Sequence, residues 1–299
     1  MEKISLSSRI LVTGASGLSG SIIVNEFIKQ NIPIRILVRD AAKVKHLAHH
    51  SIIEMFEGDL LKPETYKHAL AGIDKALLIS SAAERMTETQ QTFIDTAKEM
   101  GVPHIIKFSG ADSGIGFLSH KFVAQKEHED IEDYLIDSGA NWTILRPSQF
   151  MQMYLPKAVT GVDLSTSSLM LPIKNGKLSP VDIEDVAKVC VALLTQHCHE
   201  NKIYEMTGPD AMNMEEACGI MSAVTGRSIA YNNISMNEYE KALLNRGLPK
   251  GRVSILTQIS KQRMKCIDSH IKLDTHKRFN VRPTNFAEFL YKNLAAFVN

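Results

Sequence analysis

The sequence predicts an α/β protein: a doubly wound parallel sheet with a smaller, mostly helical C-terminal lobe. Three observations lead to this fold class. Short apolar runs alternate with helical patterns through the first half of the chain, which is typical of parallel strands joined by crossover helices. The first apolar run is followed by a glycine-rich turn, and the alternation stops near residue 155. The first half is therefore expected to form the sheet.

Six short strands are expected, and helical segments should connect them. The strands cover residues 10–12, 34–38, 52–56, 76–79, 104–108 and 142–145. The run Ala76-Leu77-Leu78-Ile79 is apolar throughout, which suits a strand buried on both faces of a parallel sheet. The expected helices cover residues 17–30, 42–48, 63–71, 83–100 and 119–137, and Gly or Pro marks most of their ends.

The pattern changes beyond Phe150. A polar run at 165–168 indicates an excursion from the sheet, residues 179–186 lead into a helix that reaches about residue 195, and residues 203–206 form a further strand. Asn213 is predicted to be a helix N-cap. Ser235 and Glu238 have the spacing of a capping box. These signals predict further helices in the C-terminal part.

The overall charge excludes some classes of function. Among 299 residues, 34 are Lys or Arg and 33 are Asp or Glu, giving a net charge of +1. No bulk field therefore attracts nucleic acid or an anionic membrane. No secretory signal and no membrane-spanning apolar run is present in the sequence, so a cytoplasmic location is expected.

The cysteine and histidine pattern predicts no metal site. The four cysteines are widely spaced and form no C-x-x-C pair, which is typical of cytosolic free thiols. His197, Cys198 and His199 are adjacent in the chain, and adjacent side chains rarely point at one ion. His46, His49 and His50 lie at helical spacing on a basic segment, which favours a solvated face.

The glycine-rich turn predicts a phosphate site. Gly14 permits the tight turn, Gly17 lets backbone N–H groups approach a pyrophosphate, and Gly20 lets the following helix lie close to the sheet. The start of that helix offers unpaired N–H groups and the positive end of its dipole. Because the turn follows the first strand of a βαβ pattern, a dinucleotide is the expected ligand. The candidate cofactor-binding residues are Thr13, Gly14, Ala15, Ser16, Gly17, Leu18, Ser19 and Gly20.

The end of the second strand predicts which dinucleotide binds. A carboxylate at this point usually binds the ribose 2′-hydroxyl of NAD, whereas an arginine accommodates the 2′-phosphate of NADP. Here Arg39 follows Val38, and its planar fork of donors matches a phosphate. Lys43 or Ser16 is placed to assist, and Asp40 is expected to point away. NADPH is therefore preferred, and NADH is the alternative.

Small and polar residues follow the next strands at the same edge of the predicted sheet. Asp59, before Leu60, either accepts from an adenine amino group or caps the segment that leads to Pro63. Ser80 and Ser81 after the fourth strand let the chain pass beneath the cofactor. Ser109 after the fifth strand is expected near the nicotinamide.

These features set the expected domain limits. Residues 1–155 form an NAD(P)-binding Rossmann domain, to which 179–207 return. Residues 156–178 and 208–299 form the smaller lobe on the substrate side.

Several motifs together resemble a known family. TGASGLSG, LVRD, GDL, LLISSA, KFSG, LRPSQFMQMY and SPVDIEDVA resemble the NmrA-like branch of atypical short-chain dehydrogenases, and the chain is most similar to the bacterial type 2 NAD(P)H:quinone oxidoreductases. The resemblance covers most of the chain. It implies hydride transfer from NADPH to a small quinone-like acceptor, with no flavin or metal site visible. Because the branch also contains regulators, a non-catalytic NADP(H) sensor is the alternative, as is a reductase of another activated double bond.

The sequence departs from short-chain dehydrogenases at the proton donor. Typical members carry Y-x-x-x-K, in which the tyrosine protonates a carbonyl. Here Phe122 stands four residues before Lys126, and phenylalanine has no proton to give. Lys126 and His128 are therefore the candidate catalytic residues, and a solvated helix face is the other interpretation of both.

Quinone reduction tolerates this loss, because its product is aromatic and the protein mainly positions the acceptor and excludes water. Phe150 and Tyr154 are the candidate apolar platform, unless they belong to the core. No direct nucleic-acid partner is expected. A homodimer and, for a sensor, a regulatory protein are left open.

Overall fold

The computed structural model describes residues 9–80, 85–116 and 123–298. The chain divides into two compact units. The first comprises Met1–Ser109, Glu127–Leu145 and Val186–Tyr204, and the second comprises Gly110–Lys126, Arg146–Asp185 and Glu205–Asn299. The units alternate along the chain more often than the predicted domain limits do, and those limits remain a proposal.

The predicted fold class is confirmed by a seven-stranded parallel sheet with flanking helices. The strand order is β3-β2-β1-β4-β5-β6-β8, which begins with the 3-2-1-4-5-6 order of a doubly wound fold. The strands are β1 (Ile10–Thr13), β2 (Ile34–Val38), β3 (Ile53–Glu57), β4 (Lys75–Leu78), β5 (His104–Phe108), β6 (Asn141–Pro147) and β8 (Lys202–Met206).

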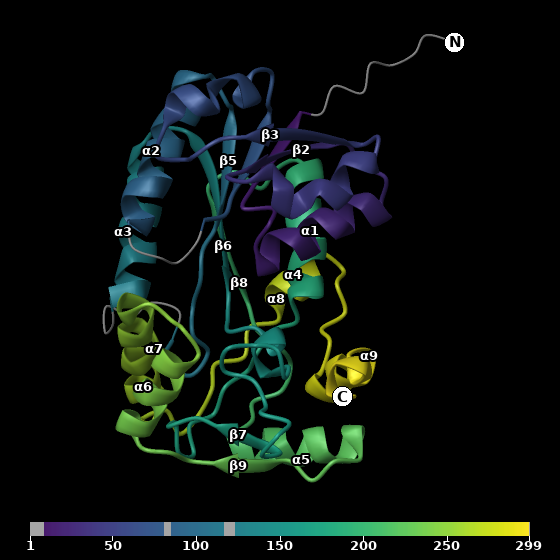
Figure 1. The fold of residues 1–299 in the computed structure, drawn as a ribbon. Helices are drawn as coiled ribbons and strands as arrows, with labels where there is room; N and C mark the ends of the chain where they lie inside the picture. Colours follow the sequence, from purple (N-terminus) through teal and green to yellow (C-terminus); the bar gives the residue numbers. More distant parts are fainter. Residues whose placement is uncertain (1–8, 81–84, 117–122, 299) are drawn as a thin grey trace. The chain divides into compact units, whose positions relative to one another are not determined.

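Helices cover both faces of this sheet. One face is covered by the helices α2 (Met86–Glu99) and α3 (Val123–Asp137). The other face is covered by α1 (Leu18–Lys29) and α4 (Ile183–Thr195) (Figure 1). On the first face, Phe93 of α2 and Ile131 of α3 join one buried apolar cluster with Leu78 and Ile105 of the strands. The apolar strand residues thus face helices on both sides, as the continuous apolar runs predict.

Two expected helices are 3-10 segments. Residues 42–48 fall in η1 (Ala41–His49), where Val44 has non-helical dihedral angles. The segment that begins at Pro63 consists of two short pieces, η2 (Pro63–Thr65) and η3 (Lys67–Leu70). Each buries at most two residues, so little packing is available to hold a regular α-helix. The predicted beginnings of α2 and α3, at residues 83 and 119, lie outside the described residues.

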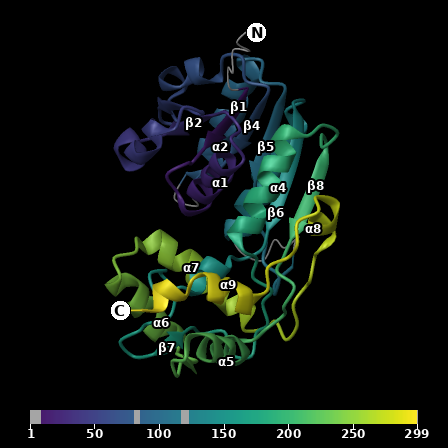
Figure 2. The same cartoon turned by 90° about the vertical axis from the view of Figure 1, so that its right-hand side faces the viewer.

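The second unit has its own core and a small sheet. The strands β7 (Ser168–Met170) and β9 (Ala230–Asn232) pair in parallel. Within this unit α5 packs against α9, and α6 against α7 (Figure 2). The helices are α5 (Met214–Thr225), α6 (Met236–Asn245), α7 (Lys250–Arg263), α8 (Asp274–Arg278) and α9 (Phe286–Lys292), and two 3-10 segments are η4 (Met151–Tyr154) and η5 (Leu294–Phe297).

Side-chain caps begin several of these helices. The predicted capping roles of Asn213 and Ser235 are confirmed, since each forms a full capping box with the glutamate three residues later. A third box, Asn285 with Glu288, begins α9. Among the described residues, no helix combines the length and the apolar character that crossing a membrane requires.

Candidate cofactor and acceptor site

The glycine loop has a backbone that side chains would disrupt. Gly14 has φ +67°, and a Cβ there would lie 2.8 Å from the carbonyl oxygen of Ile79. A Cβ on Gly20 would lie 2.1 Å from the carbonyl oxygen of Gly14. Gly17 is less constrained, and its N–H donates to the carbonyl of Gly14 at 3.0 Å. The loop therefore folds back on itself, and only glycine at positions 14 and 20 permits this.

The rim of the loop is open to solvent. Ser16, Gly17 and Leu18 are exposed, Ser19 is half-buried, and Ala15 is buried beneath them. Gly17 is the N-cap of α1, and no side chain caps that end. Because the first N–H groups of a helix have no partner inside it, the exposed start of α1 presents hydrogen-bond donors. This is the arrangement that binds a pyrophosphate.

Thr13 connects the loop to the segment after β4. Its Oγ1 accepts a hydrogen bond from the N–H of Ile79 at 2.8 Å and donates one to the carbonyl of Ile79 at 2.7 Å. The hydroxyl is buried and both bonds are internal to the first unit. Thr13 therefore contributes to the site by positioning the loop.

Arg39 is available for a ligand. It is exposed, and within the described part of the chain its guanidinium forms no hydrogen bond or ion pair. The neighbouring Asp40 points elsewhere, because its Oδ1 accepts from the N–H of Ala42 at 2.9 Å and caps η1. Thr13, at the end of β1, pairs with Leu37 near the end of β2. The glycine loop after β1 and Arg39 after β2 therefore begin at the same edge of the sheet. Lys43 on η1 is exposed as well.

Asp59 has a structural role in a turn. Its Oδ1 accepts from the N–H of Leu61 at 3.1 Å, and its own N–H donates to Oγ1 of Thr65 at 3.0 Å. Leu60 is buried in the core of the first unit. The N-cap of η2 is instead Lys62, and no side chain caps it, so Asp59 stabilises the turn before η2. Recognition of adenine by Asp59 stays a prediction.

The predicted serines at the end of the sheet differ in their surroundings. Ser80 accepts from Nε2 of Gln90 at 2.9 Å, and Ser81 lies outside the described residues. Ser109 is buried, its N–H donates to the carbonyl of Leu145 at 2.8 Å, and its hydroxyl donates to the carboxylate of Glu132. Contacts of these serines with a cofactor stay predictions.

The candidate catalytic residues occupy different environments. Phe122 lies outside the described residues. Lys126 is exposed, whereas His128 is half-buried and its Nδ1 lies 3.2 Å from Nζ of Lys107. Lys107 lies on β5 and has no exposed surface. This buried lysine was not among the predicted site residues, although a lysine inside the otherwise mostly apolar run His104–Phe108 is a signal that marks it.

The two platform candidates lie in the second unit. Phe150 is half-buried. Tyr154 is buried and meets the ring of Phe286 edge-on, with 5.4 Å between the ring centroids. Burial raises the pKa of Tyr154 to about 12. Tyr154 is thus part of the core of this unit, and acceptor contact by either residue remains a prediction.

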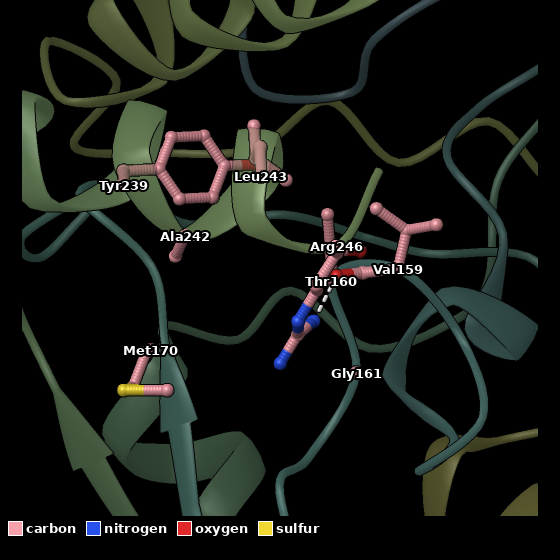
Figure 3. A pocket seen from close by; sticks show the side chains of 8 residues that line it. All are labelled: Val159, Thr160, Gly161, Met170, Tyr239, Ala242, Leu243 and Arg246. Carbon is pink, nitrogen blue, oxygen red and sulfur yellow. Dashed lines mark hydrogen bonds between the residues drawn. The ribbon is translucent and has the colours of Figure 1, made fainter. Parts of the chain in front are cut away.

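A small pocket in the second unit contains none of the predicted site residues. In Figure 3 the side chain of Arg246 reaches across it and donates to the carbonyl of Val159. The lining residues are Val159, Thr160, Gly161, Met170, Tyr239, Ala242, Leu243 and Arg246. Within the described ranges, no group of three or more His, Cys, Asp or Glu residues is arranged to hold a metal ion.

Comparison with known proteins identifies relatives over the whole length of the chain. Residues 6–290 match the NmrA-like family. The NAD(P)H azoreductase of Xenophilus azovorans is 30% identical over 293 residues, covering 96% of this chain and 99% of the relative.

Two solved structures share the fold. The NADPH-dependent quinone oxidoreductase of Escherichia coli, solved with NADPH, has a TM-score of 0.82 and 25% identity, covering 95% of this chain and 99% of that chain. The negative transcriptional regulator NmrA, solved with NADP, has a TM-score of 0.78 over 96% of both chains. At 15% identity, it is similar in fold alone.

Proposed function

The chain belongs to the NmrA-like family, and from this premise we propose that it is an NADPH-dependent reductase that transfers hydride directly to a quinone-like acceptor. The observation that carries the proposal is the loop between β1 and α1. Its backbone excludes a Cβ at positions 14 and 20 and presents the open end of α1, and such a cradle fits a dinucleotide pyrophosphate. The azoreductase and the quinone oxidoreductase supply the reaction type.

The residues around the loop fit NADPH better than NADH. Arg39 is exposed and has no ion-pair partner among the described residues, while Asp40 is held in the cap of η1. A guanidinium free to bind a 2′-phosphate, beside a carboxylate that is turned away, favours NADPH. When bound, the cofactor supplies a hydride from its nicotinamide. Asp59 and Leu60 would lie toward the adenine, Ser80 and Ser81 would let the chain pass beneath the cofactor, and Ser109 would lie toward the nicotinamide.

A quinone-like acceptor suits the residues available. At the usual tyrosine position the sequence has Phe122, so reduction of an ordinary ketone lacks its proton donor. A quinone becomes aromatic on reduction, and positioning with exclusion of water supplies much of the catalysis. Phe150 is the residue that we propose to contact the acceptor. Direct transfer requires no flavin and no metal ion.

An acceptor survey with purified protein tests the proposal. NADPH oxidation is followed without oxygen in the presence of a benzoquinone, an azo dye and an enone, with NADH in parallel. We expect the highest kcat/KM for NADPH with the benzoquinone. An enone that reacts faster would favour the reductase of another activated double bond. Tight NADPH binding without turnover of any acceptor would contradict the proposal and favour a cofactor-sensing regulator.

A further inference from the structure

Lys107 brings a charge into the interior of the first unit. It lies on β5 with no exposed surface, and its Nζ lies 3.2 Å from Nδ1 of His128 on α3. Removing an amine from water is costly unless its surroundings compensate for the lost hydration. Buried titratable side chains that contact a second titratable group are frequent at functional sites, so the pair is a candidate for chemistry.

A second polar contact joins the same strand and helix. Ser109, two residues after Lys107, donates to the carboxylate of Glu132, one helical turn after His128. Lys107, His128, Ser109 and Glu132 thus form one compact polar cluster, with Glu129 buried on the same helix.

The register of the sheet places this cluster near the glycine loop. Val12 pairs with Leu77, and Leu77 pairs with Ile106, so Lys107 is level with the end of β1 where the loop begins. Neighbouring strands are about 4.8 Å apart, which puts β5 at about 10 Å from β1. A ligand that extends from the loop across β4 therefore comes close to the cluster.

The direction of the hydrogen bond between Lys107 and His128 depends on their protonation states. As an ammonium, Lys107 has three donors and no acceptor, so Nδ1 of His128 would accept from it. A neutral imidazole that accepts at Nδ1 carries its proton on Nε2. His128 is half-buried, and Lys107 is a second proton-carrying group in contact with its Nδ1.

We propose that Lys107 and His128 form a proton relay that supplies the proton consumed when the acceptor is reduced, an inference that rests on the proposed function. Reduction of a quinone takes up one hydride and one proton. Hydride transfer leaves an anionic quinone oxygen, and this oxygen takes the Nε2 proton of His128. Nδ1 of His128 then takes a proton from Lys107, which becomes a neutral amine. To reset the relay, Nε2 of His128 takes a proton from water, and Nδ1 gives its proton back to the amine of Lys107.

The tautomer of His128 tests the geometry without any turnover. Nitrogen NMR of protein labelled with ¹⁵N-histidine reports which ring nitrogen carries the proton. We expect the Nε2–H tautomer in the wild type and a changed Nδ1 signal in Lys107→Met. A wild-type His128 protonated at Nδ1 would overturn the relay.

Two acceptors test the role of the relay in the reaction. A benzoquinone needs a hydride and a proton, whereas a cationic triarylmethane dye becomes neutral with a hydride alone. In Lys107→Met and His128→Gln we expect quinone turnover to fall about 100-fold, with dye reduction and the Kd of NADPH unchanged. Lys98→Met, which replaces an exposed lysine on α2, is the matched control and should keep both activities.

The other outcomes separate the relay from the proposed function. Equal losses with quinone and dye in both variants would assign the pair to folding or cofactor positioning and overturn the relay. Wild-type protein that reduces the dye and no quinone would also overturn it, because no proton is then needed. Wild-type protein that reduces neither acceptor would contradict the proposed function, while the tautomer measurement still tests the pair.

Discussion

The carbonyl oxygen of Gly14 occupies the space that a side chain on Gly20 would need. The two positions are six residues apart, and a Cβ on Gly20 would lie 2.1 Å from that oxygen. The start of α1 is therefore held against the turn that precedes it. This contact makes the loop a rigid cradle, and it gives the first prediction.

Replacing Gly20 with alanine should damage the loop. The new Cβ meets backbone, which cannot move without displacing β1 or α1, and overpacking of this kind costs about 1–3 kcal/mol. We expect a lower midpoint in urea unfolding and at least about tenfold weaker NADPH binding. Gly219→Ala is the matched control, because Gly219 lies in α5 with open space around its Cβ position. If Gly20→Ala binds NADPH as tightly as the wild type does, the loop between β1 and α1 is not the NADPH-binding site.

Replacing Arg39 should change the choice of cofactor. Hydrogen bonds to a charged group contribute about 1.5–3 kcal/mol, so Arg39→Ala should weaken NADPH by about 10- to 100-fold and leave NADH nearly unchanged. Titration of each cofactor by fluorescence measures both values. Lys45→Ala removes an exposed charge from η1 and serves as the control. Equal losses for NADPH and NADH would show that Arg39 does not bind the 2′-phosphate.

His104 should make the protein less stable in acid. Burial, with Lys75 nearby, lowers the pKa of His104 from 6.5 to about 4, and its Nε2 lies 2.8 Å from Oγ1 of Thr143. Between these values the unfolded chain binds a proton that the folded chain does not, so stability is lost as pH falls below 6.5. The full effect is on the order of 3 kcal/mol by pH 4. Urea unfolding from pH 4 to 7 should show a shallower pH dependence in His104→Gln.

The control for this prediction is His46→Gln, because His46 is exposed on η1. Its pH dependence should match that of the wild type. An unchanged slope in His104→Gln would mean that other groups produce the acid sensitivity. Glu200 is the first to consider, since its carboxylate lies 3.8 Å from Nδ1 of His104 and its pKa is lowered.

Two ion pairs of the second unit should differ in their contribution to stability. Arg263 on α7 contacts the buried carboxylate of Asp112 at 2.7 Å, whereas Arg282 and Glu288 form an exposed pair. Removing one partner of a buried pair costs about 3–5 kcal/mol, because the other charge is left uncompensated, and an exposed pair contributes about 0–1 kcal/mol. Arg263→Met should therefore destabilise the protein far more than Arg282→Met in urea unfolding. Similar losses would contradict this difference.

Local patterns made much of the fold predictable. The strands 34–38 and 104–108 were expected with the bounds that the structure shows, because continuous apolar runs between turn residues leave few alternatives. The N-cap at Asn213 and the capping box at Ser235 were found because their signals lie within a few residues of the helix start. The glycine spacing likewise encodes a local backbone requirement.

The features that were missed depend on contacts between distant residues. The pairing of Leu169 with Tyr231 joins two strands of three residues each, which are too short to produce an alternating pattern. The polar cluster of Lys107 and Glu132 becomes visible only when α3 is placed against β5.

An anaerobic single-turnover measurement tests the central claim most directly. Purified protein whose spectrum shows no flavin is mixed with equimolar NADPH and a benzoquinone, and the oxidation of NADPH is compared with that of NADPH deuterated at the nicotinamide C4. Direct hydride transfer predicts one NADPH consumed per quinone reduced, with a slower rate for the deuterated cofactor. NADPH that binds and stays reduced in the presence of the quinone would contradict the account.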